Sequence, residues 1–236
     1  MVSTTLLSAT AMAPRILFAL AVVAALADWV SVARPGVRLR RLEYVAKPAV
    51  PLLLIAAVTS APATDASVQL IAALALLFAC GGDVALMLPD TRGSGSLFLV
   101  GLASFLVAQL LFAVGFLIQP HGSLLACLAI MIAVAGAPAA VVLRSVRRSA
   151  PELLGPVGVY VAAITLMAAS AMAVGIHDPA RSNPIPAIVG GISFVASDLL
   201  LAINRFVRPL RHESLIVHVT YHVALFGLTL GIVAIS

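Results

Sequence analysis

Two aspartates stand inside long apolar runs of this 236-residue chain. Asp83 follows two glycines within residues 78–88, and Asp198 follows Ala-Ser within residues 194–202. A carboxylate inside a membrane-length apolar segment is costly unless it faces a partner or a cavity, so it marks a functional site by default. Two carboxylates near one cavity can divide into a protonated donor and an ionised base, which suits hydrolysis through an oxocarbenium-like species.

Six other polar side chains within apolar runs are candidates for contacts with a substrate: Lys47, Gln109, Tyr160, Asn204, Tyr221 and His222. Structural alternatives stand beside these roles. Lys47 could extend to the membrane interface or neutralise one of the aspartates. The two tyrosines could be ordinary interfacial aromatics. The sequence leaves both kinds of role open for these residues.

His218 and His222 are four residues apart, a spacing that places both on one helix face, as metal ligands can be. No glutamate stands between them and no third ligand is evident, so a structural role is favoured and no metal or cofactor is predicted. Cys80 and Cys127 lie in apolar runs without metal-ligand spacing and are interpreted as buried free thiols. Asp28 precedes the arginines of residues 34–41, which favours a solvated or ion-paired carboxylate.

The composition places these residues in a membrane. The chain is 62% hydrophobic and only 10% charged, whereas about a quarter of the residues in a soluble domain are charged. The alternation typical of a β-barrel is absent. The net charge of +5 comes from short basic clusters between apolar runs, a pattern that determines membrane topology and does not indicate a nucleic-acid surface.

The apolar runs predict an all-α fold, a polytopic membrane protein with eight transmembrane helices in one domain over residues 14–236, after a disordered segment at 1–13. Each run has about the twenty residues that a helix needs to cross the hydrocarbon core. The prolines near the start of the second run are tolerated there, because a first-turn N–H has no helical partner. The expected spans cover residues 14–33, 44–60, 68–88, 97–118, 123–143, 153–176, 185–206 and 215–235.

The arginines predict the orientation of these spans. Ten of them follow odd-numbered spans, and only Arg15 and Arg181 lie on the opposite side: Arg34, Arg38, Arg40, Arg41, Arg92, Arg144, Arg147, Arg148, Arg208 and Arg211 form the larger group. Because basic loops stay in the cytoplasm, both termini are expected outside the cytoplasmic membrane. This orientation places both aspartates in the cytoplasmic half of the bilayer and Gln109 near its midplane. Their similar settings on the third and seventh spans are compatible with a weak parallel 4+4 repeat.

Several short motifs, in order, resemble those of the YhhN family over about residues 40–235. They are Lys47-Pro48, Gly82-Asp83 with Leu86-Met87-Leu88, Gly101 with Phe105-Leu106, Tyr160, Ser197-Asp198-Leu199-Leu200-Leu201-Ala202 with Phe206, and Thr220-Tyr221. The chain departs from the family pattern at two points. Gln109 stands where a histidine is common, and Leu225 stands where a glutamine often follows the Thr-Tyr motif.

The YhhN family includes lysoplasmalogenases, so the resemblance implies an eight-span hydrolase that cleaves the vinyl ether bond of lysoplasmalogens. The substrate would be a lysophospholipid drawn from the membrane lipids, and the products a fatty aldehyde and a glycerophospho-head-group alcohol. Asp83 and Asp198 would be the catalytic pair, without assignment of the acid. Lys47 would attract the phosphate, while Tyr160, Tyr221 and Asn204 would orient the head group.

Two other classes of protein could use the same residues. In a transporter or lipid-binding protein, the two acids would carry protons or coordinate a cationic solute. In a metal-dependent membrane hydrolase, His218 and His222 would act together with the acids. Release of aldehyde from lysoplasmalogen separates a hydrolase from a transporter, and metal analysis with chelator sensitivity separates the two hydrolases.

Overall fold

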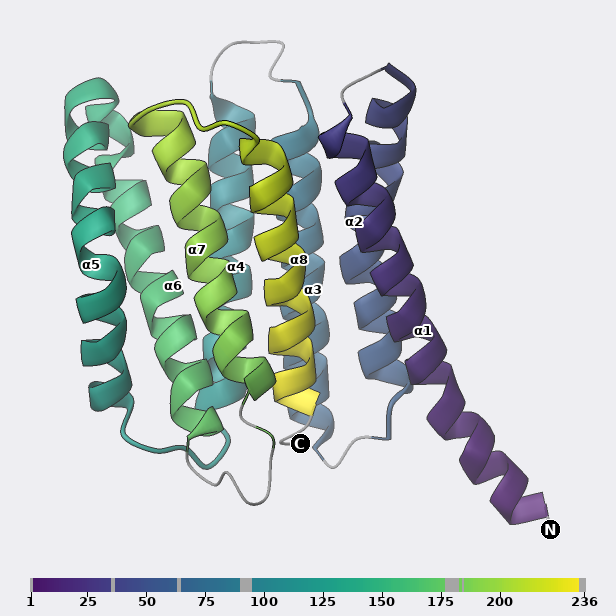
Figure 1. Cartoon of the computed structure of the whole chain (residues 1–236). Coiled ribbons are helices and arrows are strands. Elements are labelled where there is room, and N and C mark those ends of the chain that lie inside the picture. Colours follow the sequence, from purple (N-terminus) through teal and green to yellow (C-terminus); the bar gives the residue numbers. More distant parts are fainter. Residues whose placement is uncertain are drawn as a thin grey trace. The chain divides into compact units, whose positions relative to one another are not determined.

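The computed structural model of the chain describes residues 2–34, 37–62, 65–89, 95–176, 183 and 185–233. Within these residues all regular structure is helical, and eight helices are long and apolar enough to cross a membrane (Figure 1). The predicted fold class is confirmed. The helices are α1 (Val2–Ala33), α2 (Val37–Ser60), α3 (Ala66–Met87), α4 (Ser96–Leu117), α5 (Leu124–Ser149), α6 (Leu154–Gly175), α7 (Ile185–Phe206) and α8 (Glu213–Val233), with a 3₁₀ turn at Pro151–Leu153.

Three helices extend beyond the apolar runs that predicted them. Helix α2 begins at Val37 and α5 continues to Ser149, so both include arginines that were expected in loops. Arginine is a good helix former, and cations in the last turn of α5 interact favourably with the helix dipole. Helix α1 begins at Val2, within the segment predicted to be disordered. Hydropathy identifies the buried length of a helix but does not determine where its hydrogen bonding ends.

The prolines of α2 lie in the helix interior, which corrects the expectation that they stand in its first turn. Pro48 and Pro51 are preceded by three turns of helix that begin at Val37. Each proline lacks the N–H that would bond to the carbonyl four residues earlier. The carbonyls of Tyr44 and Lys47 therefore lose their usual helical donors.

The helices divide into two compact units, one formed by residues up to Leu111 and the other from Phe112 to the end of α8. The boundary falls inside α4, so it does not coincide with the halves of the expected repeat. The 4+4 repeat and the single domain stay predictions.

In the first unit, α1 packs along α2 and α2 packs along α3. The buried face of α1 consists of Ala21, Ala25, Asp28 and Ser31, spaced as one helix face. Asp28 is fully buried, so the solvated alternative is wrong, and the ion-paired alternative stays a prediction. Its position on the face that packs against α2 removes it from water.

Side-chain hydrogen bonds fix the region where α2 ends and α3 begins. Gln69 donates through Nε2 to the carbonyls of Val58 and Ala61. Asp65 caps α3, because its Oδ1 accepts from the backbone N–H groups of Ser67 and Val68 and from the Ser67 hydroxyl. These hydrogen bonds, led by the one from the Ser67 side chain, lower the pKa of the exposed Asp65 below the ordinary value of an aspartate.

Helix α4 lies against α3 through small residues. A Cβ on Gly82 would meet the ring of Phe105, and a Cβ on Gly101 would meet the side chain of Leu86 at 2.7 Å. Ser104 Oγ donates to the carbonyl of Phe78 at 2.6 Å. The small residues beside Asp83 therefore allow α4 to approach.

In the second unit, α7 packs against α5, α6 and α8. The contact between α7 and α8 is made by backbone. A Cβ on Gly227 would stand 2.6 Å from the carbonyl oxygen of Pro186 and 2.7 Å from Cα of Gly190. At the other end of the same helix, Ser145 of α5 donates its hydroxyl to the carbonyl of Phe206. Helix α7 is thus the centre of this unit.

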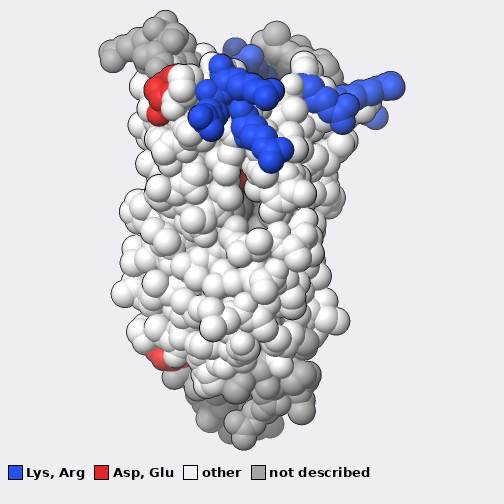
Figure 2. Space-filling model, turned by 90° about the vertical axis from the view of Figure 1, so that its left-hand side faces the viewer, with Lys and Arg blue, Asp and Glu red and all other residues white. Residues whose placement is uncertain are grey.

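Both cysteines are buried and free, as predicted. Arg92 and Arg181, which contributed to the predicted orientation, lie outside the described residues. The remaining arginines of the larger group stand at helix ends. In the second unit they stand where α5 and α7 end, and the face drawn in Figure 2 shows basic side chains gathered at one end.

Candidate functional site

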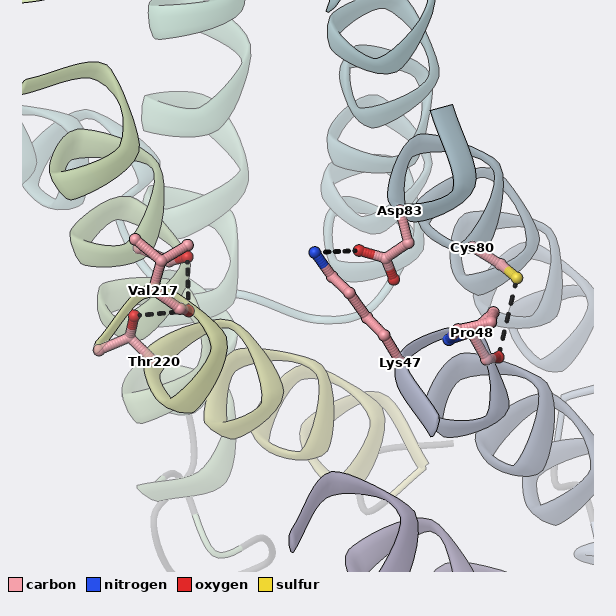
Figure 3. A network of polar contacts seen from close by, with 7 residues as sticks. Lys47, Pro48, Cys80, Asp83, Val217 and Thr220 are labelled. Atoms are coloured by element: carbon pink, nitrogen blue, oxygen red, sulfur yellow. Dashed lines mark hydrogen bonds and ion pairs between the residues drawn. The ribbon is translucent and has the colours of Figure 1, made fainter. Parts of the chain in front are cut away.

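Asp83 and Lys47 form an ion pair within the first unit (Figure 3). Lys47 Nζ lies 3.5 Å from Asp83 Oδ1, and the two side chains are 11% and 1% exposed. Lys47 is the only lysine of the chain. It points to a buried carboxylate, so it does not extend to the interface. Two charges taken out of water are tolerated only when each compensates the other. The buried cation on α2 and the buried carboxylate on α3 therefore each require the other.

The backbone around the ion pair is unusually polar for a membrane span. Cys80, one turn before Asp83, donates its thiol to the carbonyl of Pro48 at 3.8 Å (Figure 3). The carbonyl of Lys47 has no helical donor, because residue 51 is a proline. Toward the helix end, Tyr44 donates its hydroxyl to the carbonyl of Met87 at 3.5 Å, and Arg40 lies 6.0 Å from the Tyr44 ring centroid.

Gln109 is a buried amide on α4, on the side of the helix that carries Phe105 one turn earlier. Its side chain has no exposed surface, and neither its Oε1 nor its Nε2 has a hydrogen-bond partner among the described residues. A buried polar atom without a partner costs about 1–3 kcal/mol. Gln109 is therefore suited to pair with a polar group of a bound molecule, which agrees with its predicted role without testing it.

Asp198 has a neutral partner within the second unit. Tyr160 of α6 donates its hydroxyl to Asp198 Oδ2, while Asp198 itself is half-buried on α7. Tyr160 is buried, so its hydroxyl is not directed to the interface. Tyr160 lies about two turns after the start of α6, and Asp198 lies about two turns before the end of α7. The sequence named both residues but did not predict that they pair.

Helix α8 adds aromatic and imidazole groups beside α7. Tyr221 meets the ring of Phe194 edge-on with 5.6 Å between ring centroids, and the ring centroids of Tyr221 and His222 are 5.5 Å apart. Tyr221 and His222 are both buried. Ser197, next to Asp198, donates to the carbonyl of Val217 at 3.2 Å. The Thr220 hydroxyl donates to the same carbonyl (Figure 3). The bond from Ser197 joins α7 to α8 next to Asp198, whereas the bond from Thr220 lies within α8.

Asn204 has a structural function in addition to any contact with substrate. Its Oδ1 accepts the backbone N–H of Leu210 at 2.9 Å. The N–H groups of Val207 and Arg208 both donate to the carbonyl of Ile203. Asn204 therefore fixes the turn that follows α7, and its amide nitrogen can still donate to a head group.

His218 and His222 do not lie in a metal-binding group formed by the described residues. The ring centroids of His218 and His222 are 6.4 Å apart. No set of three His, Cys, Asp or Glu side chains in the described part of the chain is arranged to hold a metal ion. The donor set that the metal-dependent alternative requires is thus not assembled by these residues.

Each unit holds one intramembrane aspartate with a defined partner. Lys47 and Gln109 accompany Asp83 in the first unit, and the other predicted residues accompany Asp198 in the second. That both aspartates face one cavity stays a prediction. Sequence reasoning missed the burial of Asp28, although the small residues at positions 21 and 25 share its helix face and could have indicated it.

Comparison with known proteins gives one match. The model of the YhhN family matches residues 42–232, which include both aspartates and all the predicted site residues. Helix α1, with Asp28, lies outside the matched residues. No curated protein and no solved structure matches the chain.

Proposed function

This chain belongs to the YhhN family, and from that premise we propose that it is a membrane hydrolase that cleaves the vinyl ether bond of lysoplasmalogens. The observation that carries the proposal is the presence of two intramembrane carboxylates, each with a defined partner, inside the matched residues. Intramembrane acids are costly and are retained for a function. Acid-catalysed hydrolysis of a vinyl ether requires a proton donor and a base.

The reaction proceeds in two stages. One aspartic acid transfers its proton to the alkene carbon that is not bonded to oxygen, which leaves an oxocarbenium ion stabilised by the other carboxylate. Water then adds to the cationic carbon and gives its proton to a carboxylate, which forms a hemiacetal. The hemiacetal collapses to a fatty aldehyde and the free hydroxyl of the glycerophospho-head-group alcohol, and the protons balance.

The partners of the two acids suit these tasks. The ammonium of Lys47 balances the charge of Asp83, which allows a carboxylate to remain in a buried site. The Tyr160 hydroxyl orients Asp198 through Oδ2. The remaining residues bind the substrate: the amide of Gln109 pairs with a glycerol oxygen, and Tyr221, His222 and Asn204 surround the head group. Lys47 also attracts the substrate phosphate.

The decisive experiment is aldehyde release by the purified protein in detergent from a 1-alkenyl lysophospholipid. Matched controls are the 1-alkyl and 1-acyl lysophospholipids of the same length, neither of which contains an alkene carbon to protonate. We expect aldehyde from the alkenyl substrate alone. In D₂O the aldehyde should carry one deuterium on the carbon next to the carbonyl group, because the enzyme delivers a solvent-derived proton there.

The outcomes separate the three function classes. Release of fatty acid from the acyl lipid would identify a different hydrolase, and absence of any product would favour a transporter or binding protein. Loss of activity with a chelator and its return with Zn²⁺ would favour the metal-dependent alternative through His218 and His222.

We also propose that the helix ends rich in arginine face the cytoplasm and that both termini lie outside the cytoplasmic membrane, which follows from the positive-inside rule. Single cysteines introduced at Ser149 and at Ser123, on opposite ends of α5, test this orientation. A membrane-impermeant thiol reagent added to intact cells should label position 123 and not position 149. The reverse labelling would overturn the orientation.

A further inference from the structure

Six arginines of the second unit belong to two helix ends that are tied together. Three end α5, and three lie at the end of α7 and in the turn that follows it: Arg144, Arg147, Arg148, Arg205, Arg208 and Arg211. All six side chains are exposed. The hydroxyl of Ser145 donates to the carbonyl of Phe206, which joins the two helix ends directly. We call these six residues the arginine cluster.

The backbone beneath the cluster is fixed by further contacts. Asn204 accepts the N–H of Leu210, and Ile203 accepts from two successive N–H groups of the turn. The guanidinium of Arg205 lies 5.6 Å from the centroid of the Phe206 ring. A site whose backbone is already ordered loses less entropy when it binds a ligand, so this turn is suited to hold one anionic group in a constant position.

The charge of the cluster is only partly balanced at this end of the unit. Glu152, in the turn after α5, and Glu213, at the start of α8, are the acidic residues of the described chain at these helix ends. Figure 2 shows basic side chains projecting from one end of the face that it draws. Guanidinium groups bind phosphate oxygens through paired hydrogen bonds, which ammonium groups cannot reproduce.

We propose that the arginine cluster binds the phosphate head group of an anionic phospholipid of the surrounding leaflet, a lipid other than the lysophospholipid substrate. The positive-inside rule accounts for basic residues at these ends but does not account for two helix ends joined by a side-chain hydrogen bond. The cluster lies at the ends of apolar helices, where lipid head groups are the phosphates at hand. Basic clusters at helix ends next to the cytoplasmic leaflet attract such lipids, each arginine adding about fivefold to binding.

The test measures lipid binding to the full-length protein by native mass spectrometry, with phosphatidylglycerol and phosphatidylcholine of identical acyl chains. Wild-type protein should retain phosphatidylglycerol in preference. The triple variant R144Q/R147Q/R148Q should weaken that preference about a hundredfold, since three arginines are removed. The variant R208Q/R211Q should also weaken it, because both helix ends contribute to one site.

A matched control removes three basic residues elsewhere. The variant R34Q/R40Q/R41Q changes the net charge by the same amount and should retain the preference. Equal losses in the control, no preference in the wild type, or loss from only one of the two helix ends would each overturn the proposal.

Inorganic phosphate at millimolar concentration should not raise the melting temperature, whereas phosphatidylglycerol should. An equal rise with inorganic phosphate would identify a site for soluble anions and contradict the lipid assignment. None of these measurements depends on hydrolysis.

Discussion

The two intramembrane aspartates are stabilised in different ways. Asp83 pairs with the ammonium of Lys47 and is 1% exposed, whereas Asp198 accepts a hydrogen bond from the neutral Tyr160 and is half-buried. A carboxylate whose charge is balanced by a cation can be removed fully from water, and a hydrogen bond from a phenol orients the carboxylate oxygen that accepts it. The difference shows that one sequence cue, an acid after small residues, can lead to two electrostatic environments. Under the proposed function, the two environments would allow one aspartate to donate the proton and the other to stabilise the oxocarbenium ion.

The largest expected effect comes from removing either acid. Asp83→Asn and Asp198→Asn should each lower the rate of aldehyde release by about 10²–10⁴-fold, the usual contribution of a general acid or base. The measurement is initial rate with purified protein whose melting temperature is determined in parallel.

A matched control for these variants is Asp65→Asn, which makes the same chemical change at an exposed helix cap. Asparagine is an equally good capping residue, so this variant should keep full activity. If Asp198→Asn were fully active while Asp83→Asn was inactive, the two sites would not share a reaction.

Removing the cation should distinguish the two environments by stability. Lys47→Ala leaves Asp83 buried without its ammonium partner, so we expect a loss of about 3–5 kcal/mol in the free energy of unfolding. The double variant Lys47→Met with Asp83→Leu should be close to wild type in stability, because neither charge remains. Thermal unfolding in detergent measures both. A Lys47→Ala variant with an unchanged melting temperature would show that the ion pair contributes nothing.

The packing of the two acid-bearing helices provides another contrast. Gly227 of α8 meets the backbone of α7, whereas Gly101 of α4 meets the flexible end of Leu86 on α3. Gly227→Ala should therefore cost about 1–3 kcal/mol as overpacking, and Gly101→Ala should cost less. Gly158→Ala, at a position with open space around it, is the control. Equal melting temperatures for all three variants would contradict this account of the α7–α8 contact.

The smallest effect concerns the cap of α3. The pKa of Asp65 is lowered in the folded protein, so its stabilising contribution is present above the unfolded pKa and is lost as the pH falls through the folded value. The difference in melting temperature between the wild type and Asp65→Asn should therefore be constant above about pH 5. It should shift against the wild type as the pH falls below 3.8, the ordinary pKa of an aspartate side chain. A constant difference down to pH 2 would remove Asp65 from the capping role.

The sequence was sufficient to predict the helical spans and to locate two aspartates within them, because the length of an apolar run and an ionisable residue inside it are local properties. The catalytic role of these aspartates stays a prediction. The sequence was not sufficient for the direction of each side chain. Both lipid-facing and protein-facing surfaces of a membrane helix are apolar, so the pairing of Tyr160 with Asp198 could not be derived. Lys47 had two open roles, and only the structure places its ammonium beside Asp83.

The residues at which helices begin and end could not be predicted from the sequence either. The prolines of α2 were expected at its beginning, yet three helical turns precede them. Arginines that mark the end of an apolar run still form helix, as in the last turns of α5. Hydropathy reports the solvent around a residue, whereas a helix ends where its backbone hydrogen bonds find other partners.

The central claim is that Asp83 and Asp198 act as a unit on one substrate. The most direct measurement is a double-mutant cycle of aldehyde release with Asp83→Asn, Asp198→Asn and the double variant. Residues that act together in one step are strongly non-additive, so the double variant should be no slower than the slower single variant, within about threefold. Rate losses that multiply in the double variant would contradict a shared reaction and would place the two carboxylates in independent roles.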